Sequence, residues 1–198
     1  MTDSTDLDEL LIAHAAGHLT EAVALVVATH LCLCPESRRR YRIYEALGGL
    51  VLDELGPEDV GAVCRARLFA ALEEEASDPD CACSDPGEDP LPLPLRPYFS
   101  TRLAAAGWRH CGAFAELPLA VGREPRAKLR LLRLEPGASV PAHGHEGLEL
   151  TLVLEGGLCD RDRILRTGDL GIADASIVHA PRAETDSACL CLMVANGA

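Results

Sequence analysis

The stretch GASVPAHGHEGLELTLVLEG, residues 137–156, carries two histidines and a glutamate at close spacing, and His179 follows 23 residues after its end. A strand that holds His143 and His145 directs both imidazoles to one face, because alternate residues of a strand share a face. Glu149 then reaches the same cavity from the next strand, and His179 adds a fourth group from a distant one. Three imidazoles and one carboxylate suit a first-row divalent ion such as Zn, Fe, Mn, Ni or Cu. The sequence therefore predicts a metal site, and the alternative is a set of surface histidines on a turn.

Apolar residues alternate with other residues on both sides of the two histidines. They are Leu129, Leu131, Leu148, Leu150, Leu152 and Leu154. Turn signals interrupt this pattern at Pro136-Gly137, Gly156-Gly157 and Gly168-Asp169. Short strands with frequent turns are typical of a small β-sandwich or barrel. We therefore expect residues 98–198 to fold as a β-barrel domain around the metal site.

The first 76 residues show helical spacing instead. Apolar residues three and four positions apart predict helices over four segments: 7–14, 21–33, 35–55 and 58–76. Thr20 is a suitable cap for the second helix, and Pro35 suits the first turn of the third. In the fourth helix we expect four residues to face inward: Val63, Ala66, Phe69 and Ala70. Four short helices are typical of a bundle, so residues 1–76 are predicted to form a small four-helix bundle.

Residues 77–97, SDPDCACSDPGEDPLPLPLRP, contain six prolines and show no periodicity. Such a composition is typical of a linker. From Pro90 onward the proline spacing favours an extended, semi-rigid strap, because proline holds the backbone near the polyproline conformation. The sequence thus predicts an α+β chain of two domains, a helical one over 1–76 and a β domain over 98–198.

The net charge of −13 is concentrated in the middle of the chain. Residues 53–89 contain twelve acidic residues and two arginines, whereas residues 90–198 contain twelve of each sign. This charge repels nucleic acid phosphates, and only seven aromatic residues are available to stack on bases, so we expect no direct nucleic acid binding. The same charge attracts a basic protein surface, such as that of a DNA-binding partner. The alternative is that the acidity serves solubility alone.

The longest uncharged apolar run covers residues 22–35, which is shorter than the roughly 20 residues that a membrane-spanning helix needs. The first ten residues, MTDSTDLDEL, are acidic, whereas a secretion signal is basic and then apolar. We therefore expect no membrane span and a cytoplasmic location.

Nine cysteines are many for a cytoplasmic chain, and six of them form three Cys-x-Cys pairs. An odd total without a secretion signal argues for reduced thiols, metal ligands or redox-sensitive groups rather than a disulfide framework. Cys189 and Cys191 lie in ACLCLMVA, which is typical of a final strand, so both sulfurs should project to the face opposite Leu190. A disulfide between them would strain the strand, so oxidation there would disturb local packing. The alternative is that both thiols fill the barrel as small apolar groups.

The stretch 137–156 resembles the first motif of the cupin family, G-x5-H-x-H-x3-E-x6-G, at every fixed position. The second cupin motif places a histidine after a glycine-led turn, and Gly168 and His179 match it. Three turn positions depart from the family pattern, which usually has Pro, Gly and Asn there: Asp174, Ser176 and Ala183. The resemblance implies a cupin β-barrel, a double-stranded β-helix, with metal ligands at His143, His145, Glu149 and His179.

The N-terminal half adds a closer resemblance. The stretches AAGHLTEAVALVVATHLCLC, residues 15–34, and LPLRPY, residues 93–98, are similar to ChrR-type anti-sigma factors, and the resemblance covers nearly the whole chain. In that family a helical domain clamps an extracytoplasmic-function sigma factor, and a cupin domain senses oxidative stress. The resemblance implies the same partner and signal for this chain. It also implies a divalent ion, zinc above all, in the cupin domain, and no catalytic residues.

One part of the ChrR pattern is incomplete here. The family binds a second zinc in its helical domain through an H-x3-C-x2-C run and an early histidine. His30 and Cys34 match the run, but Ser37 stands at its last cysteine, and no histidine precedes His14. Other residues offer substitute ligands for a tetrahedral shell: Cys32, His14, His18 and the pair Cys81 and Cys83. The alternative is that His30 and Cys34 are packing residues of a metal-free bundle.

The rival interpretation is a metalloenzyme, a cupin dioxygenase or isomerase with an accessory helical domain. Three histidines and one glutamate with open coordination positions also support O2 chemistry or Lewis-acid catalysis. Against this interpretation, Glu146 is the only further acid or base spaced near the ligands, and it should face solvent. Metal identity separates the two, because zinc has no redox chemistry and disfavours O2 activation, whereas iron would favour the dioxygenase.

Overall fold

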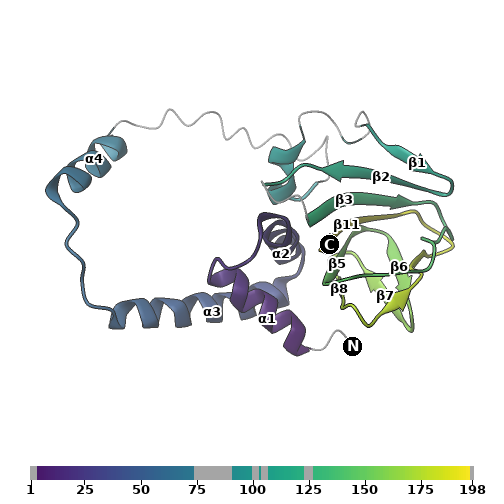
Figure 1. Cartoon of the computed structure of the whole chain (residues 1–198), viewed down its shortest axis with the longest axis horizontal. Coiled ribbons are helices and arrows are strands. Elements are labelled where there is room, and N and C mark those ends of the chain that lie inside the picture. The colour runs from purple at the N-terminus through teal and green to yellow at the C-terminus, as the bar shows by residue number, and fades with distance from the viewer. Residues whose placement is uncertain (1–3, 74–90, 100–102, 104–106, 123–126, 197–198) are drawn as a thin grey trace.

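The computed structural model describes residues 4–73, 91–99, 103, 107–122 and 127–196 of the chain. The N-terminal part is helical and the C-terminal part is built from strands (Figure 1). The helices are α1 (Ser4–Ala15), α2 (Glu21–Leu33), α3 (Pro35–Glu54), α4 (Ala62–Glu73) and the short 3-10 helix η1 (Leu93–Tyr98). The strands are β1 (Arg109–Cys111), β2 (Phe114–Leu119), β3 (Ala127–Leu134), β4 (His143–Gly144), β5 (Glu149–Glu155), β6 (Gly157–Asp160), β7 (Arg163–Arg166), β8 (Leu170–Ala173), β9 (Val178–His179), β10 (Arg182–Ala183) and β11 (Cys189–Asn196).

Helices α2 and α3 begin where the sequence predicts. The Thr20 hydroxyl accepts a hydrogen bond from the backbone N–H of Val23 at 3.4 Å and so caps α2. Pro35 occupies the first turn of α3, where its missing N–H would have no partner within the helix. Helix α4 begins at Ala62 rather than Glu58, directly after Gly61. Among the helices described, none combines the length and the apolar character needed to cross a membrane.

The predicted four-helix bundle is wrong, because α4 does not join the other three helices. Helix α1 packs on the first half of α3, where Arg40 forms an ion pair with Asp8. The second half of α3 and the whole of α4 project away from this body (Figure 1). The four α4 residues predicted to face inward are exposed: Val63, Ala66, Phe69 and Ala70. Periodicity identified the helix, but no element in the described part of the chain covers its apolar side chains.

The described strands form three antiparallel sheets. The largest has the order β1-β2-β3-β11-β5-β8, a second has the order β10-β6-β7, and β4 pairs with β9. The inner faces of the first two sheets pack together through a cluster that includes Leu132, Val153, Leu158 and Leu165. The predicted β domain is therefore present. Its described strands do not close into one continuous hydrogen-bonded barrel, which corrects the prediction of a closed cupin barrel.

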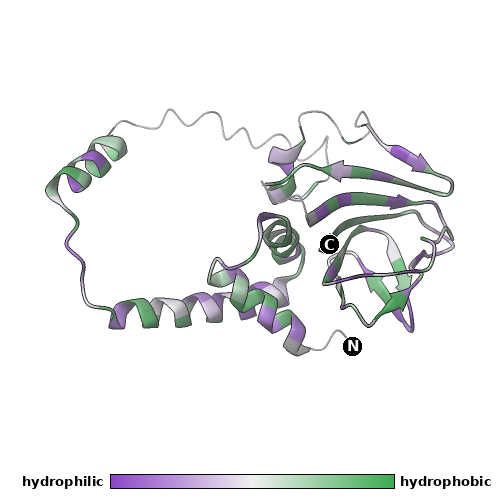
Figure 2. Cartoon of the chain, viewed as in Figure 1, coloured by the Kyte–Doolittle hydropathy of each residue, from purple (hydrophilic) through white to green (hydrophobic). Residues whose placement is uncertain are grey.

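Helix α2 lies on the outer face of the six-stranded sheet and joins the two halves of the chain. It is apolar along most of its length (Figure 2). Val26 is fully buried in one cluster with Leu150 of β5 and Leu192 of β11. Since alternate strand residues face opposite ways, Val153 and Cys191 belong instead to the inner cluster between the sheets. Strand β5 is thus buried on both faces.

The end of the proline-rich segment is helical rather than extended. Residues 93–98, predicted as part of a strap, form η1, and Leu95 of η1 is fully buried against α2. The Tyr98 hydroxyl donates to the Glu21 carboxylate at 2.8 Å, which ties η1 to the start of α2. Residues 77–90 of the predicted linker lie outside the described residues.

The packing of η1 predicts unequal effects for two leucines of the same short helix. Leu95→Ala should lower the free energy of unfolding by about 2–5 kcal/mol, because it leaves a cavity between η1 and α2. Leu93 is 68% exposed, so Leu93→Ala should cost less than about 0.5 kcal/mol. Urea unfolding of the full chain measures both. Equal, small costs would show that η1 does not belong to the core.

Candidate metal centre

The strands bring the four predicted ligands together from separate segments. His143 in β4 and His179 in β9 are directly paired across the two-stranded sheet. His145 follows β4 immediately, and Glu149 is the first residue of β5. One nitrogen or oxygen atom from each of the four lies within 4.8 Å of the others. The sequence spacing thus identified a real cluster, although β4 itself spans only two residues.

Glu149 is the centre of this cluster. Its Oε2 atom lies 3.1 Å from His145 Nδ1 and 3.7 Å from His143 Nε2. Its Oε1 atom lies 3.2 Å from His179 Nε2. The Glu149 side chain is only 2% exposed, so its charge is held inside the protein among the three imidazoles. A buried carboxylate requires such partners or a bound cation.

The polar atoms at the centre fit a divalent cation. His143 donates from Nδ1 to the Pro141 carbonyl at 2.9 Å, so Nε2 is the ring nitrogen that faces Glu149. Among the described residues, four atoms of the cluster are buried without a hydrogen bond of good geometry: Nε2 of His143, His145 and His179, and Oε1 of Glu149. Buried atoms of this kind cost free energy unless something binds them. Imidazole nitrogens and a carboxylate oxygen are suitable ligands for zinc and similar ions.

The electrostatics of the cluster also favour a cation. Burial alone would raise the pKa of Glu149, but the contact with His179 and the charges of the imidazoles outweigh it and lower that pKa. Burial lowers the pKa of His145. The hydrogen bond to Asp160, followed by the contact with Glu149, raises the pKa of His179 to about 9. The carboxylates of Glu149 and Asp160 therefore favour one positive charge between them, either a proton on His179 or a metal ion.

Asp160 is a site residue that the sequence pattern does not reveal. It ends β6, its side chain is 13% exposed, and its Oδ1 atom accepts a hydrogen bond from His179 Nδ1 at 2.9 Å. This bond orients the His179 ring and leaves Nε2 free to bind a metal. In sequence, Asp160 resembles any acidic residue of a turn. Glu146, considered above as an acid or base, is exposed, as expected.

The ligands considered for a second zinc do not form a comparable cluster in the part of the chain that the structure describes. His30, Cys34 and Ser37 lie together, whereas Cys32 is exposed. The His14 ring packs against the Tyr41 ring. Within the described residues, only the four cupin-type ligands form a group of three or more that could hold an ion. Cys81 and Cys83 lie outside the described residues.

Comparison with known proteins agrees with this architecture. Residues 100–198 match the family described as the ChrR cupin-like domain. The anti-sigma-E factor ChrR of Cereibacter sphaeroides is 41% identical over 186 residues, which are 93% of this chain and 85% of that protein. This chain belongs to the ChrR family. A chain in the crystal structure of Rhodobacter sphaeroides SigE in complex with the anti-sigma ChrR matches it with a TM-score of 0.81 and 40% identity, over 95% of this chain and 96% of that one.

Membership of the ChrR family confirms the predicted resemblance and places the β domain among cupin-like domains. The ChrR relative is an anti-sigma factor, a regulatory protein rather than an enzyme. This supports the expectation that the chain has no catalytic role, over the interpretation of a dioxygenase or isomerase.

The geometry of the cluster predicts a graded loss of metal in two full-length variants and none in a matched control. His179→Ala removes a ligand and should abolish stoichiometric binding of a divalent ion. Asp160→Asn keeps all four ligands but weakens the bond that orients His179, so affinity should fall about 10- to 100-fold. Asp162 is exposed in the turn between β6 and β7, two residues after Asp160. The control variant Asp162→Asn should therefore bind metal like the wild type.

Elemental analysis and competition with a chromophoric chelator measure this series. Wild-type affinity in Asp160→Asn would show that His179 does not need this partner. Full metal content in His179→Ala would contradict the assigned ligand set.

Proposed function

We propose that this ChrR-family protein is a cytoplasmic anti-sigma factor that sequesters an extracytoplasmic-function sigma factor and releases it on an oxidative signal. A helical domain over 1–76 holds the partner, residues 77–97 connect the domains, and a zinc-binding cupin domain over 98–198 receives the signal. The observation that carries the proposal is the row of uncovered apolar side chains on α3 and α4. The complex of SigE with ChrR supports the assignment of the partner.

The second half of α3 presents apolar residues that nothing in the described chain covers. Leu47, Leu50 and Val51 are 53%, 63% and 62% exposed. The first half of α3 packs on α1, so the helix is held at one end and extends from the body at the other (Figure 1). Contiguous exposed apolar surface of this kind marks a protein interaction site, because water exposure of so many large side chains is unfavourable.

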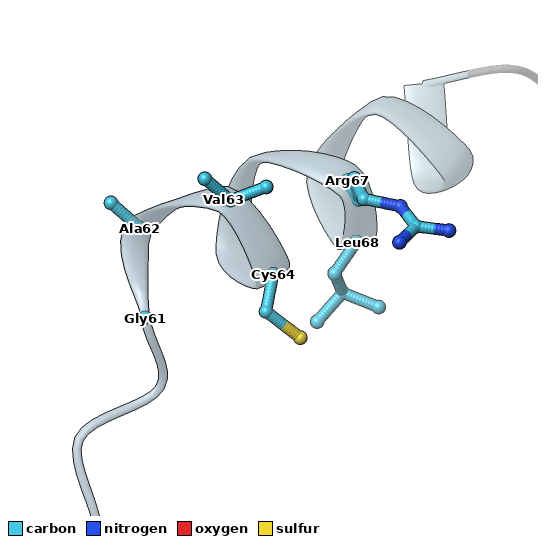
Figure 3. Close-up of a pocket in the computed structure, with 6 residues that line it drawn as sticks. All are labelled: Gly61, Ala62, Val63, Cys64, Arg67 and Leu68. Atoms are coloured by element: carbon cyan, nitrogen blue, oxygen red, sulfur yellow. The ribbon is translucent and has the colours of Figure 1, made fainter.

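Helix α4 presents a second exposed apolar surface. An open pocket lies along its first turns (Figure 3). The residues that line this pocket are Gly61, Ala62, Val63, Cys64, Arg67 and Leu68. The side chains of Cys64 and Leu68 project on one side of the helix, as residues four positions apart do. Phe69 and Leu72 are also exposed, at 57% and 69%. A partner that contacts α3 and α4 together would bury both apolar surfaces.

Charge supports a basic protein as that partner. The segment 53–89, which includes α4, has twelve acidic residues and two arginines. Sigma-factor domains are basic where they meet promoter DNA. The acidic segment therefore attracts such a domain over distance and competes with DNA for its basic surface. The apolar side chains of α3 and α4 then supply the buried contact.

The metal and two thiols in the β domain are the proposed receivers of the oxidative signal. The donor set of three imidazoles and a carboxylate suits zinc, which would hold β4, β5 and β9 together when bound. Cys189 and Cys191 are buried on the inner face of β11, with their sulfur atoms 3.4 Å apart. Their hydrogen bond lowers the pKa of Cys189 and raises that of Cys191. Oxidation there would place polar sulfur groups in a packed core.

Substitution on α3 tests the proposed sigma-binding surface. The full chain, purified from its own cells, should carry a sigma factor of roughly 20 kDa. The double variant Leu47→Asp with Leu50→Asp should bind that sigma factor about 30-fold or more weakly, as expected for loss of a central contact. Ile164→Asp, on an exposed residue of β7, should bind like the wild type. Calorimetric titration with the purified partner measures this. Equal affinities for all three proteins would place the binding surface elsewhere.

Substitution of the thiol pair tests the route of the signal. Cys189→Ala with Cys191→Ala keeps the inner core apolar and should slow peroxide-induced release of the partner by about tenfold or more. Cys111→Ser changes an exposed cysteine of β1 and should release like the wild type. Release is followed by the loss of the complex on size-exclusion chromatography. Release from the double variant at the wild-type rate would mean that the two thiols only pack and that the signal enters elsewhere, such as at the metal.

A further inference from the structure

His30 lies at the junction between the helical part and the cupin-like domain. It is in the last turn of α2, it is 3% exposed, and its Nδ1 atom lies 2.8 Å from the carbonyl oxygen of Gly168. Gly168 belongs to the turn between β7 and β8 and has a φ of +90°. A Cβ atom at Gly168 would lie 3.4 Å from the Leu33 Cβ atom, so this turn approaches α2 closely. His30 thus makes a buried polar bond between residues 138 positions apart.

The partners of His30 determine where its proton lies. A carbonyl oxygen only accepts hydrogen bonds, so His30 Nδ1 carries the proton and donates to Gly168. Burial lowers the pKa of His30 despite the opposing effects of Gly168 and Asp169, so the ring is neutral near pH 7. Its Nε2 atom therefore accepts a hydrogen bond from the Ser37 hydroxyl at 2.8 Å. The Ser37 oxygen also lies 3.3 Å from the Cys34 sulfur.

This arrangement has the form of a metal site whose ion is replaced by a hydroxyl group. A metal-binding histidine commonly donates one ring N–H to a carbonyl and directs the other nitrogen at the ion. Here the atom in front of His30 Nε2 is the oxygen of Ser37, which is itself 3% exposed and hydrogen bonded. Zinc needs four nitrogen, sulfur or carboxylate ligands, and this cluster supplies one imidazole and one thiol. The residues present do not fit the second zinc that the family resemblance implies.

We infer that the cluster of His30, Ser37 and Cys34 takes the structural place of a metal ion and fixes α2 on the β7–β8 turn without zinc in the helical part. The inference does not depend on the proposed partner. It distinguishes a metal-dependent cupin-like site from a metal-independent joint, by which we mean the contact of His30, Ser37 and Cys34 with Gly168. Removal of metal from the protein then acts on the cupin-like site alone.

The joint also connects α2 to the strand that holds Glu149. The backbone N–H of Gly168 donates to the Val153 carbonyl at 2.8 Å, and Val153 lies in β5. Val153 is in turn paired with Cys191 of β11. One backbone hydrogen bond therefore connects β5 to Gly168, and the bond between the Gly168 carbonyl and the His30 side chain connects Gly168 to α2.

Metal stoichiometry tests the first half of the inference. Zinc titration of the metal-stripped full chain should give one tight site, and the full-length variant Glu149→Gln with His179→Ala should retain none. Adding Ser37→Cys to that variant supplies a second thiolate beside Cys34 and His30, and zinc affinity should rise at least about 100-fold. Two tight sites in the wild type would overturn the inference. So would one tight site in the variant Glu149→Gln with His179→Ala, if His30→Asn then abolishes that site.

Hydrogen exchange tests the joint in the full chain. The amides of Gly168 and Asp169 donate to Val153 and Arg166, so their exchange rates report on the turn. His30→Gln loses the donor at the Nδ1 position and should raise these rates about tenfold, because it leaves a buried carbonyl unpaired. His30→Asn places an amide N–H near the Nδ1 position and should stay within about threefold of the wild type.

Thr29→Val is the matched control for these two variants. Thr29 is buried next to His30, but its hydroxyl bonds to the Leu25 carbonyl inside α2 at 2.7 Å. Exchange at residues 168 and 169 should therefore be unchanged in Thr29→Val. Exchange at the wild-type rate in His30→Gln, or an equal rise in Thr29→Val, would show that His30 does not hold the turn.

Discussion

The apolar contact between α2 and the six-stranded sheet holds the helical part of the chain on the strands. A helix as apolar as α2, whose acidic residue Glu21 is at its first position, is stable in water only when it is covered on most sides. Here β5 and β11 cover one side, while α1, α3 and η1 cover the others. Leu150 and Leu192 of the sheet meet Val26 of the helix in one cluster. Because β5 uses its other face for the metal cluster, a single strand links helix packing to the site.

Strand pairing brings together the side chains that stabilise the buried charge of Glu149. Glu149 is a buried carboxylate, and burial without compensation would favour its protonated form. Pairing of β4 with β9 brings His143 and His179 to it, and the turn after β4 adds His145. Asp160 then orients His179 from the second sheet. The site is thus assembled from elements of all three sheets, which makes it sensitive to any shift between them.

The second half of α3 and the whole of α4 differ from α2 in that their apolar side chains are exposed. Half of α3 and all of α4 lack a covering element in the described chain, so their apolar side chains contribute little to the stability of the monomer. The acidic residues of segment 53–89 favour the solubility of such a surface, and under the proposed function they also attract a basic partner. The buried core is therefore centred on α2, whereas the exposed apolar side chains proposed to bind the partner lie on α3 and α4. The joint at His30 lies between the two, at the end of α2 and the start of α3.

Local spacing in the sequence predicted several features that the structure contains: the limits of α2, the start of α3 after Cys34, the shared face of Cys189 and Cys191, and the cluster of histidines around Glu149. Caps, prolines and periodicity act over a few residues and can be recognised without a fold. Other features depend on contacts between distant parts of the chain: α4 stands apart, residues 93–98 form a helical turn, and Asp160 and Ser37 have polar partners. Periodicity shows which side of an element is apolar, but only the fold shows what covers it, because the covering residues come from distant parts of the chain.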